Sequence, residues 1–156
     1  MLRITTIPTT TTTTTTAAPI RTTHDDQIIR ADGTIRPHHH GQFCIHKRYN
    51  GYKKDQTAYV WDNCDETNDK NLWSYEDNGN IKNKGGNYCL MVRKPKIGWL
   101  QSVKIGRCSS SDIRFEFDFD GGMIVPRSNK KLCLGWKRGH RGVLNSLTCY
   151  SNNWLG

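Results

Sequence analysis

A pattern of glycine turns, short apolar segments and paired cysteines occurs three times in this chain, at a spacing of about 40 to 45 residues. In the central copy the parts are Asp77–Ile81, Tyr88–Val92, Val103–Ile105 and Cys108. The matching parts are Asp32–Ile35, Phe43–Ile45, Tyr59–Trp61 and Cys64 in the first copy, and Gly121–Ile124, Leu132–Leu134, Val143–Leu144 and Cys149 in the third. Each unit is too small to bury a core alone, so the sequence predicts one fold built from three like units.

The copies also predict which cysteines pair. Each copy carries one cysteine in its first strand and one after its second strand, which gives the pairs Cys44 with Cys64, Cys89 with Cys108, and Cys133 with Cys149. Each bridge would close a loop of about 16 to 20 residues and stabilise the fold by about 3 kcal/mol. Six free thiols in a cytosolic protein are the alternative, and zinc is disfavoured because no two cysteines have the usual ligand spacing. We therefore expect an oxidising compartment, so a secreted or extracellular protein.

The start of the chain differs from the rest in composition. Thr9 to Thr16 are all threonine, and prolines flank the run at positions 8 and 19. Such a segment cannot bury a face, so we expect residues 1–26 to be a disordered stalk or linker, whether O-glycosylated or bare, ahead of one domain at 27–156. No apolar run resembles a secretory signal or a membrane span, which predicts a module of a longer extracellular protein.

The rest of the chain reads as short strands separated by clusters of Gly, Asn, Asp and Lys, with almost no helical periodicity. Phe115–Asp120 alternates aromatic and acidic residues, which is typical of a half-buried strand. Many short strands at regular spacing predict an all-β barrel or sandwich.

Three copies of a Gly-x-Ile turn, a Cys-Leu-like strand, a second Cys and a Gln-x-Trp-like position resemble the ricin-type lectin family from about residue 27 onward. The Gln-x-Trp position is degenerate and is assigned to Asn71–Trp73, Ile113–Phe115 and Asn152–Trp154. The resemblance implies a β-trefoil of three repeats, each with one disulfide, that binds carbohydrate without catalysis. Within the family, Lys131–Gly135 and the Cys89–Cys108 segment look most like the mannose-receptor cysteine-rich domain, which implies sulfated sugars.

The same resemblance locates a candidate sugar site in the first copy. The family places a carboxylate two residues after the first-strand cysteine, and here those positions hold His46, Met91 and Gly135. The missing acids argue against ordinary galactose binding. The first copy nevertheless keeps an aromatic residue, Trp61, and an amide, Asn71, which with His46 could stack on a sugar ring and bind its hydroxyls. The alternative is that Trp61 is simply a packed or partly exposed strand residue.

The central copy offers a second, different candidate site. Trp99 follows a basic loop that contains Arg93, Lys94 and Lys96, and Lys82 to Ser111 contains seven Lys or Arg and no acid. An aromatic ring beside cations would suit a sulfated sugar, because hydrogen bonds between ions are strong. The alternative is that Trp99 caps the core and the charges are solvated.

Charge points to anionic partners. The formal net charge is +9; residues 41–77 hold five basic and seven acidic residues, whereas 121–156 hold six basic and none acidic. This field favours sulfated glycans or glycoproteins, and a surface that only confers solubility is the alternative. Specific nucleic-acid binding is disfavoured because no recognition motif is present.

No catalytic motif or cofactor-binding motif is present, so we expect neither catalysis nor a cofactor. His38–His40 are expected to lie in a loop without a metal, since adjacent side chains of an extended segment point to opposite faces. The rival function is an extracellular protein-interaction or structural trefoil that has lost its sugar site.

Overall fold

The computed structural model describes residues 29–30, 32–37, 41–51, 53–54, 56–62, 64–93, 101–136 and 142–148, and side chains of the last range as far as Leu144. These residues form strands and two short 3-10 helices, so the all-β prediction is confirmed. No helix in these ranges is long and apolar enough to cross a membrane. The predicted stalk at 1–26 and His38–His40 lie outside the described residues.

The elements follow one another in short segments. They are β1 (Cys44–Lys47), β2 (Gln56–Trp61), η1 (Asp69–Asn71), β3 (Trp73–Tyr75), β4 (Ile81–Asn83), β5 (Tyr88–Met91), β6 (Gln101–Ser102), β7 (Lys104–Arg107), η2 (Ile113–Phe115), β8 (Phe117–Asp120), β9 (Met123–Pro126), β10 (Leu132–Trp136) and β11 (Leu144–Thr148). β8 is shorter than the alternation predicts, because Phe115 ends η2 and the strand begins only at Phe117.

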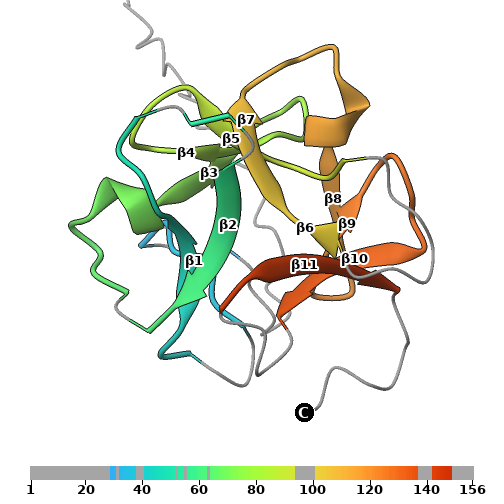
Figure 1. Cartoon of the computed structure of the whole chain (residues 1–156). Helices are drawn as coiled ribbons and strands as arrows, with labels where there is room; N and C mark the ends of the chain where they lie inside the picture. The colour runs from blue at the N-terminus through green and yellow to red at the C-terminus, as the bar shows by residue number, and fades with distance from the viewer. Residues whose placement is uncertain are drawn as a thin grey trace, which may run out of the picture.

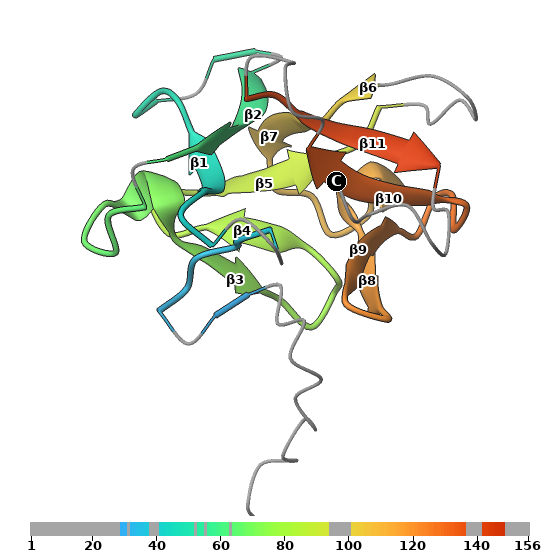
Figure 2. The ribbon, with the colours of Figure 1, turned by 90° about the horizontal axis from the view of Figure 1, so that it is seen from below.

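Antiparallel pairing joins these strands into three sheets. A six-stranded sheet has the order β1-β2-β7-β5-β4-β3, a three-stranded sheet the order β10-β11-β6, and β8 pairs with β9. Figures 1 and 2 show the sheets curling around a common interior, where β11 lies beside β2 and β10 lies beside β9. The curl places the inward side chains of distant strands in one core.

The core takes aliphatic and aromatic side chains from all three copies. It contains Ile35, Ile45, Ala58, Val60, Trp73, Ile81, Leu90, Val92, Val103, Ile105, Phe117, Ile124 and Leu144. Trp73 is 1% exposed, and its indole Nε1 donates to the carbonyl oxygen of Ile45 at 3.0 Å, so burying the ring leaves no polar group unpaired. A smaller apolar cluster, Cys89, Met91 and Phe115, lies apart from it.

The first and central copies share a backbone hydrogen-bond pattern. The amide of Trp73 donates to the carbonyl of Gly33 at 2.7 Å, and the amide of Phe117 donates to that of Gly79 at 2.8 Å. Both glycines have positive φ, +82° and +88°, in the turns that precede the buried residues Thr34 and Asn80. Glycine adopts such a backbone conformation without steric cost. Each 3-10 helix is also capped at its start by a side chain that accepts a hydrogen bond from the backbone amide two residues later. The cap is Asn68 for η1 and Asp112 for η2.

Two of the three predicted disulfides are confirmed. Cys44 is bonded to Cys64 and Cys89 to Cys108, with Cα–Cα distances of 5.7 and 4.9 Å. Each bridge ties the first strand of its copy to the chain just after the second strand. Cys133 is buried in β10, but Cys149 lies outside the described residues, so the third pair stays a prediction.

Candidate functional site

The first copy presents an outward face on the β1–β2 hairpin. Alternation buries Ile45 and Val60 in the core and turns His46, Tyr59 and Trp61 outward. His46 lies opposite Tyr59 in the antiparallel register. The His46 and Trp61 ring centroids are 5.9 Å apart with planes tilted by 31°, and Trp61 is 52% exposed. An exposed indole beside an imidazole offers a flat apolar surface with a polar edge.

Asn71 completes this arrangement from a different element. It ends η1, is fully buried, and its Oδ1 lies 2.7 Å from His46 Nδ1. Its Nδ2 donates to the carbonyl of Asp65 at 2.9 Å, which fixes the amide so that Oδ1 must accept. His46 Nδ1 therefore carries the proton, and Nε2 of the neutral ring is an acceptor.

The charge state of His46 follows from its surroundings. Burial lowers the pKa of the His46 imidazole below its ordinary value, and the positive charge of Lys70 lowers it further, while the Asn71 hydrogen bond acts in the opposite direction. The ring is therefore neutral at physiological pH. The predicted trio His46, Trp61 and Asn71, here called the first-copy site, is thus brought together with one hydrogen-bond acceptor where the family has a carboxylate.

The predicted basic site of the central copy is described only in part. Arg93 follows β5 and is exposed. Lys94, Lys96 and Trp99 lie outside the described residues, so their arrangement around a ligand stays a prediction.

Strand register identifies the central-copy counterparts of the first-copy site. Trp61 pairs with Cys44, and Gly106 pairs with Cys89, so Gly106 occupies the Trp61 position. Met91 takes the place of His46, two residues after its cysteine, and Phe115 ends η2 as Asn71 ends η1. All three polar or stacking groups are therefore replaced.

This register corrects the assignment of Ile113–Phe115 as the Gln-x-Trp position. The structure places Phe115–Phe117 there, because Phe117, not Phe115, makes the same backbone bond as Trp73 and packs in the main core. The error of two residues arose because aromatics alternate along this segment, so the sequence contains two possible positions for the tryptophan.

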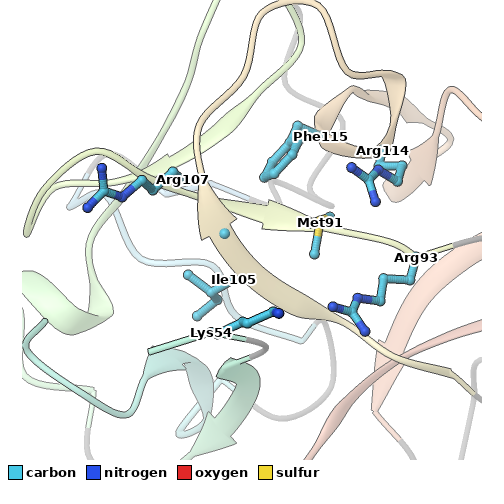
Figure 3. Close-up of a pocket in the computed structure, with 8 residues that line it drawn as sticks. Lys54, Met91, Arg93, Ile105, Arg107, Arg114 and Phe115 are labelled. Carbon is cyan, nitrogen blue, oxygen red and sulfur yellow. The ribbon is translucent and has the colours of Figure 1, made fainter. Parts of the chain in front are cut away.

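A hollow of about 400 Å³ opens at these central-copy positions (Figure 3). We call it the central-copy pocket, and its lining residues are Lys54, Met91, Arg93, Ile105, Gly106, Arg107, Arg114 and Phe115. Of these, only Arg93 was a predicted site residue. The others were missed because they become neighbours only once β2, β5, β7 and η2 are in place; the correct register of Phe115 was the one signal available.

Comparison with known proteins agrees with the all-β fold. The profile of a family described as the ricin-type beta-trefoil lectin domain matches residues 10–98 and, in a second match, 31–154. The chain belongs to this family. A search of curated proteins gave no significant match.

Solved structures of other trefoil lectins share the fold at low identity. The earthworm R-type lectin C-half in complex with GalNAc has 12% identity and a TM-score of 0.53, covering 71% of this chain and 82% of that one. The earthworm lectin C-terminal domain mutant in complex with 6'-sialyllactose has 13% identity and a TM-score of 0.53, covering 70% and 82%. The beta-trefoil lectin of the Vibrio vulnificus hemolysin/cytolysin, with N-acetyl-D-lactosamine bound, has 12% identity and a TM-score of 0.50, covering 69% and 88%. The closer placement beside the mannose-receptor domain stays a prediction.

Proposed function

We propose that this domain is a non-catalytic lectin module that binds carbohydrate through the first-copy site and prefers anionic glycans. The observation that carries the proposal is the convergence of His46, Trp61 and Asn71 from two strands and a 3-10 helix. The indole face would stack on the C–H face of a sugar, and neutral His46 would accept from a hydroxyl. Family membership and sugar-bound relatives support this reading.

The preference for anionic glycans rests on charge. The basic central copy, with Arg93 and the predicted Lys94, Lys96 and Trp99 beyond it, would attract a sulfate or carboxylate group. We also propose the full three-repeat trefoil with a third bridge, Cys133 to Cys149, in an extracellular protein with more domains than this chain. Two formed disulfides support the extracellular location.

Glycan-array binding of the wild-type chain and of Trp61→Ala tests the proposal. We expect binding to a subset of glycans, stronger for acidic ones, and a loss of neutral-sugar binding of about tenfold or more in Trp61→Ala, the scale of a lost aromatic contact. Tyr49→Ala removes another exposed aromatic outside the first-copy site and is the control. No binding to any glycan would contradict the lectin proposal and favour the rival protein-interaction trefoil, which the absence of a carboxylate in all three copies would then explain.

A further inference from the structure

The central-copy pocket lies where a sugar-binding platform would lie in the first copy, and its inner surface is apolar. Gly106 supplies no side chain, and a Cβ placed there would lie 3.0 Å from Phe115 Cζ and 3.1 Å from Phe115 Cε1. The Phe115 ring therefore covers the strand where Trp61 stands in the first copy. Met91 lies beside it, its sulfur 3.8 Å from the same Cβ position. The floor is formed by the ring of Phe115 and the thioether of Met91, which are 5% and 7% exposed.

Within the part of the chain that the structure describes, the lining side chains include no hydrogen-bond acceptor of ordinary strength. Apart from the weakly accepting sulfur of Met91, the polar side chains are Lys54, Arg93, Arg107 and Arg114, which are donors only. A neutral sugar would gain apolar contact here but leave its hydroxyl donors without a side-chain partner. A ligand that brings its own acceptors and negative charge fits this lining better.

The four basic side chains differ in how they can contribute to binding an anion in the pocket. Figure 3 shows Lys54, Arg93 and Arg114 extending toward the hollow beside Met91, whereas Arg107 points away from it. Arg114 is also engaged with Asp112, its Nε lying 2.9 and 3.0 Å from the two carboxylate oxygens. That carboxylate offsets one charge and holds the guanidinium in place. Lys54 and Arg93 are both exposed and supply the positive charge on the opposite side of the floor.

We propose that the central-copy pocket binds the anionic substituent of an acidic glycan, a sulfate ester or a carboxylate, with the sugar ring lying on Met91 and Phe115. This rests on the proposed lectin function and deepens it: the first-copy site takes a neutral ring, and the central-copy pocket takes a charged one. The two sites use the same positions of the fold with opposite side-chain chemistry.

Titration calorimetry with four ligands tests the proposal: galactose, galactose 6-sulfate, 6'-sialyllactose and inorganic sulfate. The decisive variant is Lys54→Gln with Arg93→Gln. The matched control is Lys84→Gln with Lys131→Gln, which removes the same charge from two exposed lysines outside the pocket. Near-ultraviolet circular dichroism confirms that each variant is folded.

The wild-type chain should bind at least one acidic sugar about tenfold more tightly than galactose, the scale of one hydrogen bond to a charged group. The Lys54 and Arg93 variant should lose that advantage, and the control should keep it. Loss with the sulfated sugar alone assigns a sulfate ester, and loss with the sialylated sugar alone assigns a carboxylate; both support the pocket. Trp61→Ala should lose its affinity for galactose but should still bind the acidic sugar.

Two results would overturn the pocket while leaving the lectin function intact. One is an equal loss of affinity for the acidic sugar in the pocket variant and in the control, since the binding would then come from attraction to the overall charge. The other is equal affinity for inorganic sulfate and the best acidic sugar, since the ring would then contribute nothing. If wild-type chain binds none of the sugars, the proposed function itself fails.

Discussion

His46 shows how one side chain replaces a carboxylate. Its Nδ1–H is held by Asn71, so the neutral ring offers Nε2 as an acceptor at the position where the family has an acid. A carboxylate accepts through two oxygens at any pH above its pKa, whereas the imidazole accepts through one nitrogen and only while neutral. The proposed sugar binding at the first-copy site would therefore depend on pH.

We predict that neutral-sugar affinity falls as the pH drops through the lowered His46 pKa, because protonation turns Nε2 from acceptor to donor. Since the pKa is lower in the folded than in the unfolded state, the unfolded state binds more protons between the two values, so stability also falls as pH drops below about 6.5. NMR titration of His46 would measure its pKa, and calorimetry with galactose across the same pH range would measure the affinity. Urea unfolding at the same pH values would measure the stability. In His46→Gln the pH dependence should vanish; an unchanged profile would contradict the assignment.

Lys47 is a buried cation with a structural role. Its side chain is 1% exposed, its Nζ donates to the carbonyls of Asn50 and Gly85 at 3.3 Å each, and it lies 4.2 Å from the centroid of the Tyr88 ring. Burial lowers the pKa of the Lys47 ammonium, and Lys70 lowers it further while Asp69 raises it. The side chain thus links a loop of the first copy to the β4–β5 turn.

We predict that Lys47→Ala lowers the free energy of unfolding by about 2 to 4 kcal/mol, through the lost stem packing and two carbonyls left without this donor. Lys47→Met, which keeps the stem volume, should cost about half as much. Urea unfolding followed by tryptophan fluorescence gives both values. A cost under about 0.5 kcal/mol for the alanine variant would mean that water replaces the ammonium without loss.

At the scale of elements, a close backbone contact joins the turn before β11 to β2. The amide of Val60 donates to the carbonyl of Gly142, and Val143 forms a bridge with Tyr59. Gly142 has a φ of +68°, and a Cβ there would lie 2.6 Å from the carbonyl oxygen of Val60. Only glycine allows β2 and this turn to approach so closely.

Gly142→Ala should therefore destabilise the fold by about 2 to 4 kcal/mol, since the backbone must leave a left-handed conformation and a rigid carbonyl cannot yield. Gly51→Ala is the matched control: no atom lies within 4 Å of its Cβ position, so its change should stay within about 0.5 kcal/mol. Thermal unfolding by calorimetry compares the two. Equal midpoints for both variants would show that this contact is not required.

At the scale of the whole molecule, the repeat in the sequence was enough to predict the fold class and two cysteine pairs. Its glycine turns and first-strand cysteines recur in identical order, and Cys44–Cys64 and Cys89–Cys108 follow directly. The trio His46, Trp61 and Asn71 was also predicted, because the family pattern fixes their spacing. Their convergence depends only on the β1–β2 register and on η1.

The central-copy pocket could not be predicted in the same way. Lys54 comes from the β1–β2 loop and Arg107 from β7, and no sequence spacing relates them. The aromatic alternation at Phe115–Phe119 also concealed the register, since a shift of two residues keeps every aromatic in phase. The lining of the pocket and the register at Phe115 depend on tertiary contacts between strands of different copies, which a local sequence pattern does not reveal.

The net charge of +9 predicts how salt acts on binding. General attraction to polyanions should weaken steeply as salt rises toward about 1 M, where the screening length is about 3 Å. Stacking on Trp61 should persist, because it depends on apolar contact. Binding of heparin and of galactose measured across a salt series separates the two; parallel decay of both would contradict a distinct apolar site.

The backbone bonds shared by the first and central copies have an evolutionary consequence. The residues that make them, around Gly33 and Gly79, differ from the residues of the first-copy site and of the central-copy pocket. A duplicated unit can therefore exchange its recognition chemistry by point mutation while the scaffold is conserved. A combinatorial library restricted to Met91, Gly106 and Phe115 would sample new specificities with the scaffold hydrogen bonds left intact.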